Sequence, residues 1–123
     1  MKVSEHFNKY EFYCKGNKRG VCKCNQSIVD AELLIVLEDL RSHFGLPIKI
    51  YSGYRCPKYN SYVGGAKRSK HRLGIASDIR IFGVRPKKVY EYLNEKYPNK
   101  YGIGNYDNFT HIDIRSNKAR WHG

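Results

Sequence analysis

Apolar residues recur at helical spacing between residues 33 and 44, and this stripe predicts the main core helix. Ser27 is a favourable residue type for the N-cap, and Gly45 is typical of the position that ends a helix. The stripe consists of Leu33, Val36, Leu37, Leu40 and Phe44. One face of this helix is therefore expected to lie in the core.

Two further helices are predicted where proline occupies a first-turn position, because proline there loses no helical hydrogen bond. Pro57 starts a brief helix that runs to about Val63. Pro86 starts a longer helix that ends before Pro98. The glycine pair at 64–65 opens a long basic loop between these two helices.

Strands are predicted where isoleucines alternate with polar residues. This pattern covers residues 76–82 and 110–115, and a shorter strand is predicted at 48–51. The polar face of the first alternating segment carries Asp78, and that of the second carries His111. If the two strands pair, both side chains will lie on one surface of the sheet, away from the core.

These elements predict a single domain, residues 1–123, of the α+β class. We expect a small, mostly antiparallel sheet with helices packed on one face. A chain of 123 residues is long enough to bury one hydrophobic core and too short for a second.

The chain is strongly basic, with 23 Lys and Arg residues against 11 Asp and Glu residues and a formal net charge of +12. Such a charge attracts polyanions, including nucleic acid and anionic cell-wall polymers, without distinguishing among them. Lysines that simply keep a small domain soluble are the alternative explanation. Because no nucleic-acid-binding motif accompanies the charge, no specific nucleic-acid partner is expected.

No apolar run approaches the roughly 18 to 20 residues that a membrane-spanning helix needs. Residues 1–10 are polar and charged, unlike the apolar segment of a signal peptide. We therefore expect a protein that is made in the cytoplasm without a signal peptide. If the substrate lies in the cell wall, another component must release the protein to reach it. We expect a monomer.

Three of the four cysteines, Cys14, Cys22 and Cys24, lie close together in a loop rich in glycine and lysine. Their spacing lacks the paired CxxC motifs of a zinc ribbon, so a loop disulfide or buried thiols are favoured over a second metal site. Cys56 precedes Pro57 and has no histidine near it in the sequence. It is a poor candidate for a nucleophile.

Two histidines and an aspartate form the strongest chemical signal in the chain. His71, Asp78 and His111 supply two imidazoles and one carboxylate, a ligand set that leaves the fourth position of a catalytic zinc site open for water. His71 belongs to the long basic loop, and a glycine midway lets the chain turn back toward the strand of Asp78. Ser69, two residues before His71, suits a hydrogen bond that orients this ligand or the substrate.

Several segments resemble the D-alanyl-D-alanine carboxypeptidase type of zinc peptidases, which shares its fold with the metal-binding domain of hedgehog proteins. The resemblance covers nearly the whole chain and favours the short, single-domain branch found in bacteriophages and bacteria. The segments that carry it are Phe12–Cys14, Ser52–Arg55 with Asn60, Val63–Ala66, Ser69–Asp78, Gly102–Gly104, Phe109–Asp113 and Ala119–Trp121.

This resemblance implies that the three ligands above hold Zn²⁺ and that the substrate is a peptide of peptidoglycan. It also implies that Arg55 faces the substrate. A guanidinium there can hold a terminal carboxylate or stabilise the oxyanion of a tetrahedral intermediate. We expect Asn60 and Ser69 to join Arg55 in binding the substrate.

The motif leaves two candidates for the general base. Family members often carry Glu, Asp or His just ahead of the last zinc ligand, where this chain has Asn108 and Phe109. Asp113 is the preferred substitute, because on a strand it projects to the same face as His111. Asp107 is the second choice. The alternative role for Asp113 is to orient His111.

Three classes of function follow from these observations. The leading hypothesis is a zinc-dependent peptidase that cuts peptidoglycan stem peptides or cross-bridges, as a carboxypeptidase or an endopeptidase of the endolysin type. The second is a non-catalytic, metal-stabilised module that binds the cell wall. The third is a basic nucleic-acid-binding protein, which only the net charge supports.

Overall fold

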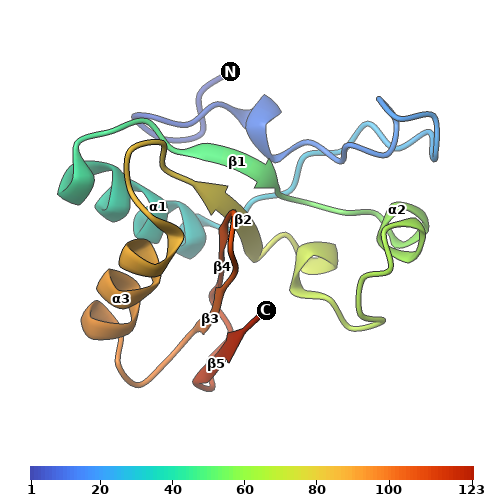
Figure 1. Cartoon of the computed structure of the whole chain (residues 1–123). Helices are drawn as coiled ribbons and strands as arrows, with labels where there is room; N and C mark the ends of the chain where they lie inside the picture. The colour runs from blue at the N-terminus through green and yellow to red at the C-terminus, as the bar shows by residue number, and fades with distance from the viewer.

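A five-stranded sheet forms the centre of the molecule, as seen in a computed structural model that describes residues 1–123 (Figure 1). The strands lie in the order β1-β2-β4-β3-β5. All neighbours are antiparallel except β3 and β5, which are parallel. Their bounds are β1 Lys49–Ser52, β2 Ala76–Arg80, β3 Gly102–Asn105, β4 Thr110–Asp113 and β5 Ala119–His122. The predicted α+β class with a mostly antiparallel sheet is confirmed.

Three α-helices and two short 3-10 helices surround this sheet. The α-helices are α1 Ala31–Phe44, α2 Pro57–Tyr62 and α3 Pro86–Lys96, and the 3-10 helices are η1 Lys9–Phe12 and η2 Lys70–Leu73. In Figure 1 the two long helices, α1 and α3, lie on one side of the sheet, and α2 lies on the other. None of the helices has the length and apolar character needed to cross a bilayer.

The hydrophobic core fills the space between the two long helices and the apolar face of the sheet. Four residues of the predicted α1 stripe are fully buried, and Phe44 packs at the edge of the core. The sheet contributes Ile79, Ile103 and Ile112, each almost inaccessible to solvent. Burying one such side chain stabilises the fold by roughly 1.5 to 3 kcal/mol. The opposite face of the sheet is left for polar side chains.

Helix α1 begins later than predicted, because Asp30 rather than Ser27 is its N-cap. The Asp30 carboxylate accepts a hydrogen bond from the backbone N–H of Glu32 at 2.8 Å. Ser27 instead pairs through its backbone with Tyr13 and donates its hydroxyl to the carbonyl of Lys9 at 2.5 Å. This long-range pairing keeps residue 27 extended, and helical periodicity does not reveal such pairing.

The predicted strands are present, with ends that differ from the prediction by one or two residues. Two other strands, β3 and β5, were not predicted. The sequence of β3 is Gly-Ile-Gly-Asn, with a single apolar side chain, and that of β5, Ala-Arg-Trp-His, alternates over only four residues. Both strands extend the sheet beyond β4, and both contribute to the site described next.

Candidate metal centre

Asp78 on β2 lies directly opposite His111 on β4, as the predicted pairing of the two strands requires. His71 reaches the same place from η2. The potential ligand atoms of these three residues all lie within 4.8 Å of one another. All three residues are buried, with exposed fractions of 3% for His71, 8% for Asp78 and 9% for His111. We call this cluster the His–Asp centre.

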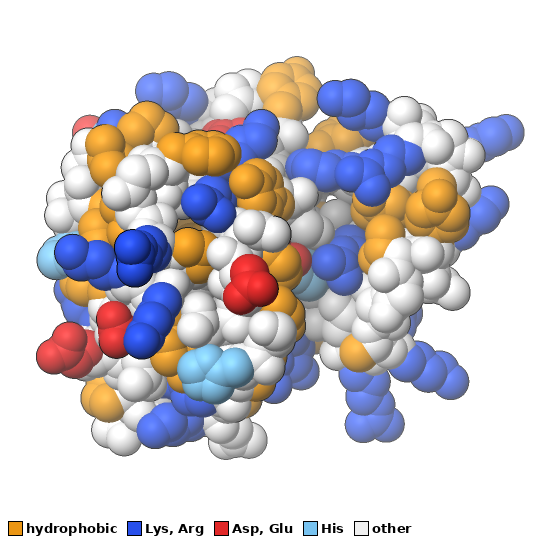
Figure 2. All heavy atoms as spheres, in the orientation of Figure 1, with side chains coloured by type: hydrophobic (Ala, Val, Ile, Leu, Met, Phe, Trp, Pro, Cys, Tyr) orange, Lys and Arg blue, Asp and Glu red, His pale blue; other side chains and the backbone are white.

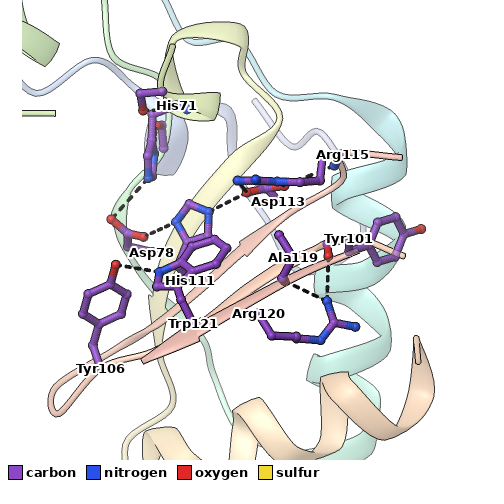
Figure 3. Close-up of polar contacts among 12 residues, drawn as sticks. His71, Asp78, Tyr101, Tyr106, His111, Asp113, Arg115, Ala119, Arg120 and Trp121 are labelled. Carbon is purple, nitrogen blue, oxygen red and sulfur yellow. Dashed lines mark hydrogen bonds and ion pairs between the residues drawn. The ribbon is translucent and has the colours of Figure 1, made fainter. Parts of the chain in front are cut away.

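The carboxylate of Asp78 bridges the two imidazoles (Figure 3). Its Oδ2 lies 3.3 Å from Nε2 of His71, and its Oδ1 lies 2.9 Å from Nδ1 of His111. The remaining nitrogen of His71, Nδ1, is 2.8 Å from the carbonyl oxygen of Gly53, to which it donates when protonated. This bond directs Nε2 toward Asp78.

The donor set fits a divalent metal ion. Two imidazole nitrogens and one carboxylate oxygen face a common point, and each histidine has its second ring nitrogen engaged elsewhere. Such contacts fix the orientation of histidine ligands in metal sites. The three residues can therefore supply three ligands and leave a further position for water or substrate.

Asp113 lies behind His111, on the side away from Asp78. Its Oδ2 is 2.8 Å from Nε2 of His111, and Arg115 donates to both of its oxygens at 2.8 and 2.7 Å. The Asp113 side chain is completely buried. Figure 3 shows the resulting row of contacts from His71 through Asp78 and His111 to Asp113 and Arg115.

The charges in this row reinforce one another. Burial opposes ionisation of Asp78, but hydrogen bonds from His111 and His71 hold its pKa well below the usual range. Burial likewise opposes ionisation of Asp113, and its bonds to His111 and Arg115 lower its pKa. The pKa of His111 is raised, because its bonds to Asp113 and Asp78 outweigh the effect of burial. Both carboxylates are thus anionic at neutral pH.

Arg55 lies over the His–Asp centre and is held by three side chains. Its Nε donates to Ser52 Oγ at 3.2 Å, its Nη1 to Asn60 Oδ1 at 3.3 Å, and its Nη2 to Asp78 Oδ2 at 3.5 Å. Asn60 is only 3% exposed and also donates to the carbonyl of Ala66. Asn60 therefore lies beneath Arg55 rather than in the pocket.

The His–Asp centre opens into a pocket of about 580 Å³ between the sheet and the loop that follows α2. Ser69 lines this pocket and accepts a hydrogen bond from the backbone N–H of His71 at 3.2 Å. Four cations line it, namely Arg55, Arg68, Lys70 and Arg115, and Asp78 is its one acidic residue. Figure 2 shows Lys and Arg side chains spread over the face of the molecule that carries α2.

Asp107 is exposed in the turn between β3 and β4. Its neighbours Tyr106 and Phe109 line the pocket, whereas neither Asp107 nor Asp113 does. Of the predicted site residues, the structure thus brings Arg55, Ser69 and the three metal ligands to one pocket. It leaves Asn60 and Asp113 buried beside that pocket and Asp107 exposed at the turn.

Sequence reasoning missed the aromatic wall of the pocket. Trp121 lies beside His111 with ring centroids 5.1 Å apart, and its indole N–H donates to the hydroxyl of Tyr106 at 2.8 Å. Arg115 lies over the Trp121 ring at 5.3 Å. This wall depends on Gly104, because a side chain there would collide with the indole. The available signal was that Trp121 is the single tryptophan in the chain.

Buried side chains that could bind a metal ion beside a substrate-sized pocket are typical of proteins in which a metal ion acts on a bound ligand. The family model described as Peptidase M15 matches residues 5–113. The chain therefore belongs to the peptidase M15 family, and the protein is a metallopeptidase. This match confirms the resemblance identified from the sequence motifs. Searches of curated proteins and of solved structures gave no match.

Proposed function

We propose that the protein is a zinc-dependent peptidase that hydrolyses peptide bonds in bacterial peptidoglycan, in stem peptides or cross-bridges. The observation that carries this proposal is the His–Asp centre, because its three ligands open onto a pocket of substrate size. Two histidines and one carboxylate are one of the ligand sets of catalytic Zn²⁺ sites in peptidases. When bound, it lowers the pKa of a water molecule and polarises a carbonyl group.

The cations around the pocket select for an anionic substrate. Asp78 is committed to the metal, so the net charge of the remaining lining is positive. Peptidoglycan stem peptides carry free carboxylates and meet this requirement. Arg55 is held rigidly by Ser52 and Asn60, so its guanidinium is preorganised to bind a substrate carboxylate or the oxyanion.

Two predicted substrate contacts take different roles in this proposal. Ser69 holds the backbone of His71 and borders the pocket, which suits both orientation of the ligand and contact with the peptide. The burial of Asn60 argues against direct contact with substrate and supports a role in positioning Arg55.

Asp113 is better suited to positioning than to proton transfer. Both of its oxygens are engaged, by His111 and Arg115, and solvent does not reach it. These features argue against the base role preferred from the sequence. They support the alternative role, in which Asp113 holds Nε2 of His111 so that Nδ1 faces the metal.

We assign the general base to Asp107, the second candidate from the sequence. It lies in an exposed turn between two residues that line the pocket, Tyr106 and Phe109. Catalytic hydrogen bonds often tighten only when substrate is bound, so an exposed carboxylate at the rim of the pocket can still act as the general base. In this role it takes a proton from water and passes it to the leaving amine.

The zinc peptidase proposal is tested by release of amino groups from purified peptidoglycan. We expect His71→Ala, which removes a ligand, to lower this release at least roughly 100-fold, and chelation of metal to do the same. His43→Ala, an exposed histidine on α1, is the matched control and retains activity. Full release by His71→Ala, or by the chelated protein, would contradict the proposal. Mass analysis of products from one defined stem peptide identifies the bond.

The assignment of the base is tested separately with Asp107→Asn. We expect this variant to bind zinc normally and to lose roughly 100-fold in kcat, because proton transfer contributes about that much or more. Glu91→Gln, an exposed acid on α3, serves as the control. Unchanged kcat in Asp107→Asn would remove Asp107 from the mechanism and leave the metal assignment intact.

A further inference from the structure

The sulfur atoms of three cysteines converge at one point and the fourth cysteine packs against them, although Cys56 is far from the others in the sequence. The Sγ atoms of Cys14 and Cys22 are 4.0 Å apart, and those of Cys14, Cys22 and Cys56 all lie within 4.8 Å of one another. Cys24 packs against the same cluster. We call these four residues the cysteine cluster.

No disulfide joins any of these residues, so the loop disulfide considered from the sequence is not formed. The spacing matches a different chemistry. A tetrahedral zinc ion with Zn–S bonds of about 2.3 Å has its sulfur atoms roughly 3.8 Å apart. The sulfur atoms of Cys14 and Cys22, 4.0 Å apart, are close to this value, and those of Cys14, Cys22 and Cys56 lie within 4.8 Å of one another. Rotations of the side chains would bring the sulfur atoms to the spacing of a zinc site.

Backbone N–H groups point at the sulfur atoms, as they do where thiolates must be stabilised. Cys56 donates to Sγ of Cys14 and Tyr59 donates to Sγ of Cys56, each at 3.5 Å. A divalent cation among the sulfur atoms would stabilise their thiolate forms further.

The surroundings of the cluster are apolar. Cys14 and Cys56 are buried, Cys22 and Cys24 are partly buried, and Tyr54, Tyr59 and Val21 pack in the same cluster. A metal held there by four thiolates would have no open position for water. Complete coordination by protein ligands is the mark of a structural metal site rather than a catalytic one.

The loop that carries three of the cysteines needs such support. Residues 14–26 contain no helix or strand and include four basic side chains, Lys15, Lys18, Arg19 and Lys23. The backbone hydrogen bonds of this loop join residues within it, like charges along it repel, and few of its residues are apolar, so a metal would add support from outside the loop. Figure 1 shows this loop extending toward α2, which begins immediately after Cys56.

We propose that Cys14, Cys22, Cys24 and Cys56 form a closed tetrathiolate zinc site that fixes the 14–26 loop to the start of α2. The site is separate from the His–Asp centre and does not depend on the proposed function. Cys56 follows Arg55 directly, so the same metal anchors the segment that carries this arginine.

The proposal is tested with the full chain, prepared metal-free with its four thiols reduced. Titration with Zn²⁺ is expected to saturate at about two ions per chain. Titration with Co²⁺ is expected to give the intense near-ultraviolet charge-transfer absorption of cobalt thiolates, which histidine and carboxylate ligands do not produce. Bound Zn²⁺ is expected to protect all four thiols from alkylation, as measured by mass spectrometry.

Variants separate the two centres. His71→Ala is expected to bind one ion and to keep the cobalt–thiolate absorption. The double variant Cys22→Ser/Cys24→Ser changes the two less buried cysteines and is expected to lose that absorption and one zinc ion. Lys23→Ala, an exposed residue between them, is the matched control and behaves as the unmodified chain.

Absence of cobalt–thiolate absorption in the reduced, unmodified chain would overturn the proposal, as would loss of that absorption in His71→Ala. Rapid alkylation of all four thiols in the presence of saturating Zn²⁺ would also overturn it. These readouts use chains that keep all four cysteines, so misfolding of the serine variant cannot decide the result. If His71→Ala loses peptidase activity but keeps the cobalt–thiolate absorption and the protection of its thiols, the cysteine site is supported independently of the proposed function.

Discussion

The His–Asp centre and the cysteine cluster differ in the parts of the fold that hold them. Paired strands place Asp78 and His111, and hydrogen bonds fix the orientation of each ring. Loops and the start of α2 supply the cysteines, which are enclosed by aromatic side chains. Strands give the precision that chemistry on a substrate needs, whereas a metal bound by loops gives order to segments that lack a core.

The largest expected effect is on stability, and it sharpens this comparison. In the zinc-loaded protein, Cys14→Ser is expected to lower the free energy of unfolding by about 3 to 5 kcal/mol, because a structural metal contributes directly to folding. Lys23→Ala is expected to change it by less than about 0.5 kcal/mol. Urea unfolding of each variant measures the difference. Equal stability of the two variants would contradict a structural role for the cysteine cluster, and with it the distinction between the two centres.

A smaller effect is expected at the strand-borne centre. Asp113→Asn keeps the shape of the side chain but removes the charge that holds Nε2 of His111, so zinc affinity at the His–Asp centre is expected to fall 10- to 100-fold. Competition with a chromophoric chelator measures this affinity. Asp39→Asn, a carboxylate bonded to Tyr92 and Lys96 far from the metal, is the control. Full affinity in Asp113→Asn would deny it the positioning role.

The smallest expected effect is a pH dependence of the metal-free protein. The raised pKa of His111 contributes stability that is present below its ordinary value of 6.5 and is lost as pH rises through the higher value in the folded state. The lowered pKa values of Asp78 and Asp113 contribute stability that is lost as pH falls below 3.8. Stability should therefore be highest between these limits.

Urea unfolding across pH, with chelator present, checks this expectation. The decline above pH 6.5 is expected to be at most about 1.4 kcal/mol per pH unit, the limit for one proton. His111→Gln should remove it. Saturation with Zn²⁺ should reverse its sign, because metal and protons compete for the same imidazoles. A decline that persists in His111→Gln would place its origin outside the His–Asp centre.

The sequence was sufficient to predict the parts of the site that follow a local pattern. Alternation along residues 76–82 and 110–115 was enough to expect that Asp78 and His111 would share one surface of the sheet. Other features depend on contacts between distant segments, namely the closeness of Cys56 to the other cysteines and the place of Trp121 beside His111. Local periodicity in the sequence does not indicate such contacts. The two glycines of β3 also lower its strand propensity, so the strand is not recognised from the sequence.

The base shows a related limit of sequence reasoning. Strand alternation correctly places Asp113 on the same face as His111, but it does not say which side of the imidazole the carboxylate will occupy. That outcome depends on Arg115, which donates hydrogen bonds to both oxygens of Asp113. The sequence thus predicts the face of the strand on which a side chain lies, but not the direction in which the side chain points on that face.

The position of Trp121 has a practical consequence. Because it is the only tryptophan in the chain and its ring lies 5.1 Å from that of His111, a proposed metal ligand, its fluorescence originates beside the His–Asp centre. Emission intensity therefore provides an intrinsic optical signal of occupancy, with no label attached. Filling of the cysteine cluster should leave that signal largely unchanged, so one spectrum distinguishes which of the two places an added ion has entered.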